Sequence, residues 1–375
     1  MRIAILGAGP AGLYLSFLIK RRQPDADVTV IEQNPADATF GFGVVFSDRA
    51  LEFLREDDEA TYAAIVPHME SWADITLVHR GERIVIDGVG FAAIGRLKLL
   101  QLLQARVRSV GIEPVYRRAV KNLDELDGFD LVVGADGVNS LVRRSHTTEF
   151  GASVDHLSNR FAWFGTAKRF ETLTQTFLET DSGHFNAHHY RYAGDQSTFI
   201  VEVNAATFER AGFAGMSEAE TRAACERVFA EALDGHPLIS NNSIWRQFPL
   251  VHNERWSHAN RVLIGDALHT AHFSIGSGTR LAMEDAIALD KALAAQPRDL
   301  PAALAAYEAA RRPVLEKLVA GANGSAYWYE HFAERMRLRG AEFAMSYIMR
   351  SGRVDIERLR KLSPRFVARY ERERN

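Results

Sequence analysis

The chain has 375 residues, 47% of them hydrophobic and 25% charged, so it can bury one large or two medium cores and is not typical of a disordered protein. A formal net charge of −3 gives no global reason to expect a nucleic-acid partner. The single cysteine, Cys225, excludes an internal disulfide and a cysteine-rich metal site, and we expect no bound metal.

The N-terminus holds one arginine before a strand begins, which is not typical of a signal peptide. No apolar run approaches the roughly 20 residues of a membrane span. We therefore expect a cytoplasmic protein with no membrane partner. The sequence does not distinguish a monomer from a homodimer.

The chain opens with a dinucleotide-binding pattern. A buried-type strand over 2–6 runs into G-x-G-x-x-G and an apolar helix, and a second strand ends at Glu32, twenty residues beyond Gly12. That spacing suits a carboxylate that binds an adenosine ribose with a free 2′-hydroxyl, which favours FAD or NAD over NADP in this pocket. The residues expected around the pyrophosphate are Gly7, Gly9, Pro10, Ala11 and Gly12.

The next stretch, 40–48, combines glycines with aromatic and β-branched residues, and we interpret it as a hydrophobic loop. In a flavoprotein such a loop could lie against the isoalloxazine. Ser47 or Asp48 is then expected to cap a helix that runs to about Ile65 and ends before Pro67.

Alternation over 74–78 and 83–86 predicts a hairpin, and the periodicity of 95–111 predicts a helix that Arg96 opens. An arginine in this position is usually solvated, but a glycine-flanked guanidinium can also reach a phosphate. A parallel-type strand over 130–134 leads to Asp136 and Gly137, with Asn139 or Ser140 as a helix cap.

The region 160–203 is strand-rich and predicts an antiparallel sheet that covers the cofactor. Adjacent strand residues face opposite sides, so at most one of His188 and His189 addresses the cofactor. Ser217 and Glu220 predict a capping box, and Asp299 with Pro301 predicts the start of a long helix.

The stretch 262–289 predicts a strand, a small-residue loop and a helix, an arrangement that suits an anionic or electron-rich group. Its candidate ligand residues are Gly265, Asp266, Gly276, Gly278 and Thr279. The tail from Met349 is rich in arginine, but glutamates interleave with it, which favours a solvated helix face.

These nucleotide motifs, in this order and spacing, resemble the flavin-dependent aromatic hydroxylases of the para-hydroxybenzoate hydroxylase type over nearly the whole chain. Longer stretches are similar to the members that act on aryl-CoA thioesters, namely the hydroxylase part of 2-aminobenzoyl-CoA monooxygenase/reductase and salicylyl-CoA 5-hydroxylase. These stretches are 40–48, 90–96, 163–166, 197–202 and 271–278. One departure is His272-Phe273, where many relatives have proline.

The resemblance implies an α/β fold: a Rossmann-like FAD-binding domain of the glutathione-reductase type, an inserted antiparallel substrate sheet and C-terminal helices. The expected boundaries are 1–70, 96–152 and 255–330 for FAD binding, 71–95 and 153–254 for the substrate domain, and 331–375 for the helical segment.

It also implies roles. Glu32 and the glycine motif would hold the ADP half of FAD, Arg96 the pyrophosphate or ribityl region, and Asp266 the ribityl hydroxyls. Asp136 and Gly137 would serve FAD and the nicotinamide donor together. Three residues would line the isoalloxazine: Gly43, Val44 and Val45. Gly276 and Gly278 would present N–H groups to the flavin pyrimidine.

The implied reaction is reduction of FAD by NADH or NADPH, formation of a C4a-hydroperoxyflavin with dioxygen, and hydroxylation of an activated aromatic ring. The expected substrate is a CoA thioester such as salicylyl-CoA or 2-aminobenzoyl-CoA, whose phosphates could meet the basic tail or arginines of the sheet. His272, His188 or His189 are the candidates for a base or acceptor near the ring substituent. Alternatives are a free aromatic acid, tryptophan, or a flavin-dependent reductase that inserts no oxygen.

Overall fold

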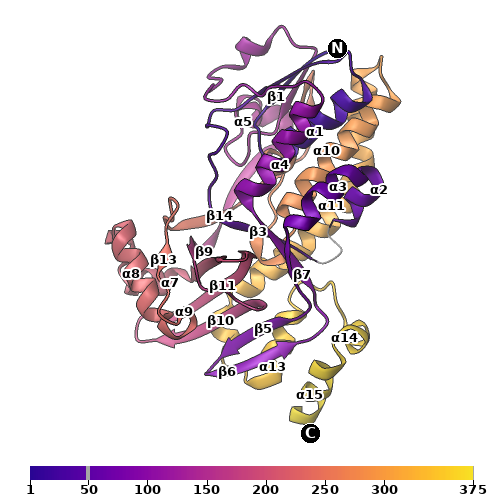
Figure 1. Cartoon of the computed structure of the whole chain (residues 1–375). Coiled ribbons are helices and arrows are strands. Elements are labelled where there is room, and N and C mark those ends of the chain that lie inside the picture. The colour runs from indigo at the N-terminus through magenta and orange to yellow at the C-terminus, as the bar shows by residue number, and fades with distance from the viewer. Residues whose placement is uncertain (48–50, 375) are drawn as a thin grey trace.

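The computed structural model describes residues 1–47 and 51–374. The chain is a mixed α/β protein built on three sheets, with long helices beside the five-stranded sheet and shorter helices around the largest sheet (Figure 1). The two termini lie at opposite ends of the molecule (Figure 1).

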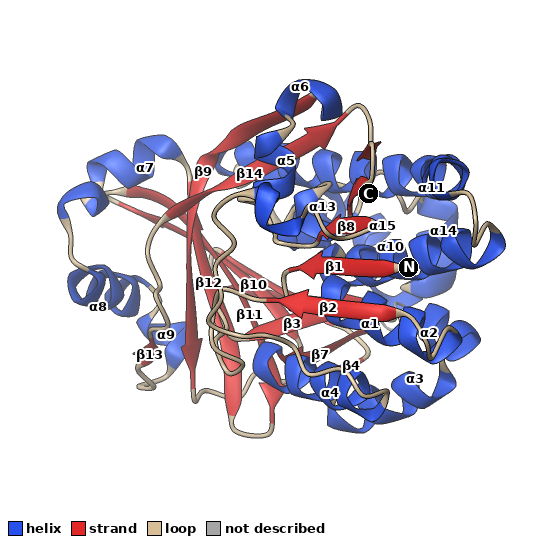
Figure 2. Ribbon diagram, turned by 90° about the horizontal axis from the view of Figure 1, so that it is seen from above, coloured by secondary structure: helices blue, strands red, loops and turns tan. Residues whose placement is uncertain are grey.

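The first sheet has five strands in the order β15-β16-β8-β1-β2, and all are parallel except β15. Figure 2 shows β8, β1 and β2 pointing toward the large sheet. In parallel sheets, ligands bind at the carboxyl edge of the strands. The bounds are β1 (Arg2–Leu6), β2 (Asp27–Ile31), β8 (Leu131–Gly134), β15 (Ser257–His258) and β16 (Arg261–Leu263).

Long helices pack beside this sheet. The helix after β1 contacts both α10 and α4, and α10 runs against α11 (Figure 1). The bounds are α1 (Pro10–Arg22), α4 (Arg96–Ser109), α10 (Gly278–Ala295) and α11 (Leu300–Glu330), with the short α5 (Leu141–Ser145) and α6 (Thr147–Phe150) after β8. Asp299 caps α11 by accepting the N–H of Ala302, as the sequence predicts.

The large sheet follows the order β13-β9-β12-β11-β10-β5-β6, and β14 pairs with β9. It is antiparallel except where β5 lies parallel to β10, so the predicted hairpin extends this sheet. The bounds are β5 (Ile75–His79), β6 (Glu82–Ile86), β9 (Ala152–Thr166), β10 (Leu173–Thr180), β11 (Gly183–Ala193), β12 (Gln196–Val203), β13 (Leu238–Ile239) and β14 (Arg246–Asn253).

Each face of the large sheet has its own core. One face packs Phe185, Phe199 and Val201 against helices that include the predicted capping box at Ser217 and Glu220. The other face packs Tyr190 and Phe177 against the C-terminal helices. The helices are α7 (Ala205–Arg210), α8 (Glu218–Val228) and α9 (Ala230–Leu233) on the first face, and α12 (Phe332–Arg335), α13 (Gly340–Ile348), α14 (Ile356–Leu362) and α15 (Pro364–Arg374) toward the second.

The third sheet corrects the interpretation of 40–48 as a loop. Residues 43–47 form β3, because Val44 and Val45 pair with β7 in an antiparallel ladder. This sheet joins a strand from the predicted 1–70 segment with one from 71–95, so a predicted domain boundary cuts through it. Its strands are β3 (Gly43–Ser47), β4 (Glu70–Trp72) and β7 (Phe91–Gly95).

The single helix expected up to Ile65 is also wrong, because the chain forms α2 (Glu52–Asp57) and α3 (Glu59–Ile65). Asp58 breaks the run with an extended backbone and caps α3 by accepting the N–H of Thr61. Ser47 closes β3 and caps none of the helices in the described residues, while Asp48 lies outside those residues.

Much of the arginine-rich tail is neutralised within the protein. Arg360 pairs with Glu357 and Glu371, and Arg369 pairs with Glu82 and Glu373. These contacts fit the predicted solvated helix face. None of the helices in the described ranges is both long and apolar enough to cross a membrane.

A buried carboxylate fixes α10 to the turn that follows β16. Asp285 accepts a hydrogen bond from the N–H of Gly265 at 3.1 Å and one from Arg311 Nε at 2.8 Å. It also forms a hydrogen bond with His269 Nε2 at 2.7 Å. Burial raises the pKa of such a carboxyl, but His269 and Arg311 together hold the pKa of Asp285 below its ordinary value.

Asp285→Ala is expected to lower the free energy of unfolding by about 3–5 kcal/mol, because it leaves the buried Arg311 without this partner. Asp290→Ala on the same helix is the control. The side chain of its partner Arg22 is 42% exposed, against 6% for Arg311, so a loss nearer 1 kcal/mol is expected. Urea unfolding measures both variants, and equal losses would contradict this account.

Candidate active site

A cleft of about 830 Å³ opens at the carboxyl edge of the five-stranded sheet. This volume lies in the upper part of the range of about 300–1,000 Å³ that is usual for ligand pockets. The predicted cofactor residues that line it are Gly7, Gly9, Pro10, Glu32, Val44, Arg96, Asp136, Gly137 and Thr279. Those that do not line it are Ala11, Gly12, Gly43, Val45, Gly265, Asp266, Gly276 and Gly278.

The three glycines of the first motif do different things. Gly7 has a φ of +99°, and a Cβ there would lie 2.2 Å from the carbonyl oxygen of Ala135. A Cβ at Gly12 would lie 2.0 Å from the carbonyl oxygen of Gly7, so α1 packs directly on the turn. A Cβ at Gly9 would meet nothing within 4 Å, which leaves the N-terminus of α1 open toward the cleft.

Glu32 is held rigidly beside that turn. Its Oε2 accepts the N–H of Ala8 at 2.9 Å, and its Oε1 accepts both the backbone and the side-chain N–H of Asn34 at 2.8 Å. Such bonds fix the orientation of the carboxylate, and each oxygen keeps capacity for a further donor from a ligand.

Arg96 and Asp136 reach the cleft from two other elements. Arg96 begins α4, and its Nε has no hydrogen-bond partner among the described residues. Burial lowers the pKa of Arg96, against the attraction of Asp266. Asp136 accepts the N–H of Leu141 at 2.6 Å through Oδ2, while Oδ1 has no partner in the described chain. Burial raises the pKa of Asp136.

These features fit the polar half of a dinucleotide. An unpartnered guanidinium nitrogen and an open helix N-terminus suit a pyrophosphate, and an unpartnered carboxylate oxygen suits a hydroxyl donor. Ser140 caps α5 by accepting the N–H of Arg143, so the cap is Ser140 and not Asn139.

The loop between β16 and α10 connects the cleft with the large sheet. On one side, a Cβ at Gly276 would lie 2.9 Å from Val45 of β3, and Thr279 lines the cleft. On the other side, Thr270 Oγ1 donates to the carbonyl of Pro249 in β14 at 2.7 Å. The side chain of Asp266 is exposed to solvent.

Aromatic side chains gather where this loop meets the sheet. Phe273 lies 4.9 Å from Phe161 and 6.0 Å from Phe248, measured between ring centroids, and all three rings are only partly buried. His272 lies on the same loop, 4.9 Å from the Phe248 ring. Partly exposed aromatic rings beside a polar buried group are typical of a pocket for a flat aromatic ligand.

His188 and His189 separate as the alternation along β11 requires. His188 faces the loop, with its ring stacked 4.8 Å from Tyr329. His189 faces the opposite core, stacked 5.0 Å from Phe199 and bonded to Thr176. We therefore do not retain His189 as a candidate base.

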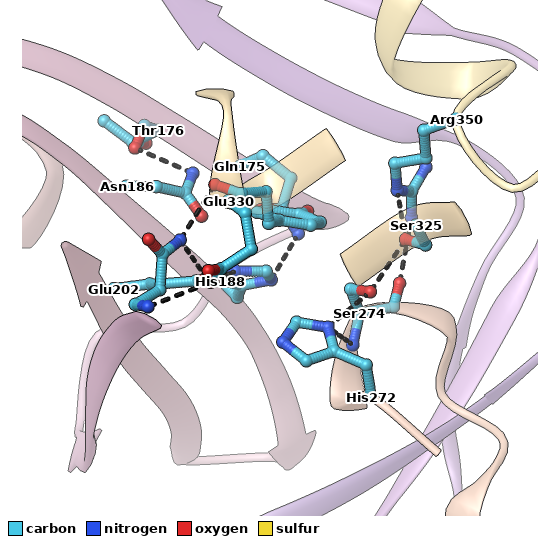
Figure 3. A network of polar contacts seen from close by, with 12 residues as sticks. Gln175, Thr176, Asn186, His188, Glu202, His272, Ser274, Ser325, Glu330 and Arg350 are labelled. Atoms are coloured by element: carbon cyan, nitrogen blue, oxygen red, sulfur yellow. Dashed lines mark hydrogen bonds and ion pairs between the residues drawn. The ribbon is translucent and has the colours of Figure 1, made fainter. Parts of the chain in front are cut away.

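His188 is bonded at both ring nitrogens. Its Nδ1 lies 3.0 Å from Gln175 Nε2, and its Nε2 lies 3.1 Å from Glu202 Oε2 (Figure 3). An amide nitrogen only donates, so Nδ1 accepts and Nε2 donates to the carboxylate. Burial lowers the pKa of His188 to about 3 and raises the pKa of Glu202. His188 thus has no free nitrogen for a substrate.

His272 differs from His188 in this respect. The hydrogen bonds of its ring in the described chain all involve Nδ1, which lies 2.8 Å from Ser274 Oγ. Burial lowers the pKa of His272 to about 4, against the attraction of Glu202, so the imidazole is neutral at pH 7. Its Nε2 remains available to a ligand.

One group of potential metal ligands lies away from the cleft. One ligand atom from each of His146, Glu149 and His258 lies within 4.8 Å of the others. Burial and the nearby Arg261 lower the pKa of His146, and the charge of Arg261 also opposes a cation there. We do not assign a metal to this group.

Comparisons with known proteins decide the family. A model of the FAD binding domain matches residues 112–322. The chain is 43% identical over 361 residues to salicyloyl-CoA 5-hydroxylase from Streptomyces sp, covering 94% of this chain and 70% of that protein. It is 36% identical over 329 residues to 3-hydroxy-4-methyl-anthranilyl-(aryl-carrier protein) 5-monooxygenase from Streptosporangium sibiricum, covering 88% and 89%.

The chain belongs to the FAD-dependent aromatic monooxygenases. The predicted family, enzyme class and FAD cofactor are confirmed. The fold is similar to that of PqsL from P. aeruginosa, solved in complex with 2-aminobenzoylacetate, with a TM-score of 0.69 and 22% identity over 89% of this chain and 98% of that one.

Sequence reasoning about this monooxygenase missed the residues that support its cleft. Arg143 is buried and donates to the carbonyls of Ala267 and Val138, which joins the turns after β8 and β16. Asp285 and Arg311 hold the second turn from behind. The signal that the sequence contains is a charged residue on the apolar face of a predicted helix. This signal does not identify the partner of the charged residue.

In this monooxygenase, Gly9→Ala and Gly12→Ala should fail in different ways. Gly12→Ala is expected to lower the free energy of unfolding by about 1–3 kcal/mol, because the new methyl group overlaps the backbone of Gly7. Gly9→Ala should leave unfolding unchanged without FAD but weaken FAD binding at least about tenfold, because its methyl group projects into the cleft. Flavin titration and denaturant unfolding separate the two effects. Tight FAD binding by Gly9→Ala would contradict this assignment.

Proposed function

We propose that this protein hydroxylates an activated aromatic ring, with an aryl-CoA thioester such as salicylyl-CoA or 2-aminobenzoyl-CoA as its substrate. The observation that carries this proposal is the partly exposed aromatic wall of Phe161, Phe248 and Phe273, which lies where the loop between β16 and α10 meets the large sheet. Two relatives named for thioester-linked or carrier-linked aromatic substrates support it.

The proposal includes the finer architecture and chemistry. The parallel sheet would be a Rossmann-like FAD-binding domain of the glutathione-reductase type, and the large sheet would be the inserted substrate domain. FAD, reduced by NADH or NADPH, supplies the electrons that activate dioxygen. In balance, the arene, dioxygen, NAD(P)H and a proton give the hydroxylated arene, NAD(P)⁺ and water.

The residues of the protein would bind the cofactor, orient the aromatic ring and shield both from water. Glu32 would hold the adenosine ribose, and Arg96 with the N-terminus of α1 would hold the pyrophosphate. Asp266 would bond the ribityl hydroxyls, and Asp136 with Gly137 would serve FAD and the nicotinamide donor. Gly43, Val44 and Val45 would line the isoalloxazine, and Gly276 and Gly278 would present N–H groups to the flavin pyrimidine. Phe273 and its aromatic neighbours would place the ring and exclude water, which prevents loss of reducing equivalents to solvent.

The thioester would extend away from the ring toward cationic side chains. Arg246 is exposed and lies at the rim of the cleft. Arg360 and Arg369 of the tail already pair with carboxylates, so the CoA phosphates would find a freer partner at Arg246.

The direct test supplies the FAD-loaded protein with NADH or NADPH, labelled dioxygen and a panel of arenes. Salicylyl-CoA or 2-aminobenzoyl-CoA should give a product that is heavier by one labelled oxygen atom and should stimulate NAD(P)H oxidation. The panel includes the free acids and tryptophan. Turnover of a free acid alone would exclude a thioester as the substrate. Stimulated NAD(P)H oxidation without a labelled product from any arene would indicate a reductase.

His272→Ala should lower the rate of ring hydroxylation by about 10²-fold or more without releasing FAD, since a hydrogen bond to the ring substituent is lost. His189→Gln is the matched control, because His189 is equally buried but faces the opposite core. Product formed per NAD(P)H and the flavin content measure the two effects. Unchanged hydroxylation by His272→Ala would reject its role.

A further inference from the structure

A chain of side-chain hydrogen bonds links His272 to the C-terminal helices. Arg350 Nε donates to Ser325 Oγ at 2.9 Å. Ser325 Oγ lies 2.7 Å from Ser274 Oγ, which lies 2.8 Å from His272 Nδ1. Figure 3 shows these four side chains in sequence, with the second nitrogen of His272 on the side away from Ser274. Its members come from the loop after β16, from α11 and from the residues after α13.

One direction gives every proton in this set of hydrogen bonds an acceptor, and it starts from Arg350. A guanidinium can only donate, so Ser325 Oγ is an acceptor toward Arg350. The single hydroxyl proton of Ser325 is then free to point at Ser274, its other partner in the described chain. Ser274 accepts that proton and directs its own toward His272 Nδ1.

The backbone acts in the same direction but weakly. The N–H of Ser274 also points at His272 Nδ1, at 3.4 Å. A proton on Nδ1 would face this N–H, and it would leave one of the two serine hydroxyl protons without an acceptor in this set of hydrogen bonds. Nδ1 is therefore an acceptor.

Arg350 is itself held in place. Its Nη1 donates to the carbonyl of Tyr347 and its Nη2 to the carbonyl of Ser274, each at 2.8 Å. Its guanidinium lies 3.9 Å from the centroid of the Tyr347 ring. The guanidinium of Arg350 is thus fixed by a hydrogen bond from each of its two terminal nitrogens and by the Tyr347 ring against its face.

We propose that Arg350 is a positioning residue which, through Ser325 and Ser274, holds His272 as the tautomer protonated on Nε2. His272 then presents an N–H donor to the bound arene and does not act as a base. The second statement rests on the proposed function, because it needs an arene beside the loop.

This tautomer selects a class of arene. Toward the ring substituent, an N–H donor bonds a phenolate oxygen, and it favours the ionised over the neutral phenol. It offers nothing to the N–H groups of an arylamine. The expected substrate therefore has an oxygen acceptor as its ring substituent, which favours 2-hydroxybenzoyl over 2-aminobenzoyl thioesters.

The tautomer can be read without turnover. The FAD-loaded full-length protein, labelled with ¹⁵N-histidine, gives two-bond ¹H–¹⁵N correlations, and the signals lost in His272→Gln belong to His272. Nδ1 should show the shift of an unprotonated nitrogen and Nε2 that of a protonated one. The reverse pattern in the wild-type protein would overturn the proposal.

Ser325→Ala tests the link, because it removes the relay hydroxyl but leaves the bond from Arg350 to the carbonyl of Ser274. A mixture of His272 tautomers is expected. Ser346→Ala is the matched control: Ser346 bonds the Trp328 indole in the same core and has no link to His272. Its spectrum should match the wild type. An unchanged His272 spectrum in Ser325→Ala would also overturn the proposal.

Arg350→Lys provides a second variant if Ser325→Ala does not fold. A lysine cannot bond Ser325, Tyr347 and Ser274 in the fixed geometry of the arginine fork, so the tautomer should again become mixed. A wild-type tautomer in this variant would count against the proposal. These spectra are recorded without substrate, so the expected tautomer with no aryl-CoA hydroxylation would reject the proposed function alone.

Discussion

The carboxylate of Asp285 holds the turn on which the rest of the site depends. It is buried and bonded to the N–H of Gly265, to His269 and to Arg311. Gly265, with a φ of +60°, begins this turn. Glycine backbone is conformationally permissive, so the hydrogen bond to Asp285 is needed to fix it. Because the carboxylate lies on α10, the helix that follows the loop also fixes where the loop starts. The position of Asp266 near Arg96, and of the loop against β3, follows from this one anchor.

The far part of the same loop has a different support. Thr270 is tied to β14, and the carbonyl of Ser274 is held by Arg350. The loop is thus fixed to the nucleotide-binding side by one network and to the large sheet and C-terminal helices by another. This arrangement keeps the cofactor side and the aromatic wall in a constant relation. A loop that is fixed from both sides has little freedom to move. Oxygen transfer over a short distance requires such a fixed geometry.

The sequence predicted the parts of this site that depend on local patterns. Gly7, Gly12 and Glu32 follow from a spacing that each βαβ unit must satisfy, and the opposite faces of His188 and His189 follow from the period of a strand. It predicted β3 wrongly as a loop, because a short strand is defined by a partner, β7, that lies far along the chain. It also could not find Asp285 with Arg311, or Arg350 with Ser274. Those pairs form only when distant helices pack together, and a single charged residue in an apolar stretch does not identify its partner.

The same limit explains why the sequence leaves open whether His272 is a base or an acceptor. In sequence, a histidine in a cofactor loop offers two equivalent nitrogens, and a base near an activated ring is a reasonable expectation. In the structure the nitrogens are not equivalent, because donors from Ser274 converge on Nδ1. Burial then lowers the pKa of His272 to about 4, so the ring does not gain a second proton at neutral pH. A neutral imidazole with a fixed acceptor on one side has a fixed donor on the other. In the arrangement that we propose, the chemistry available to His272 depends on Arg350, a residue more than seventy positions away in the chain.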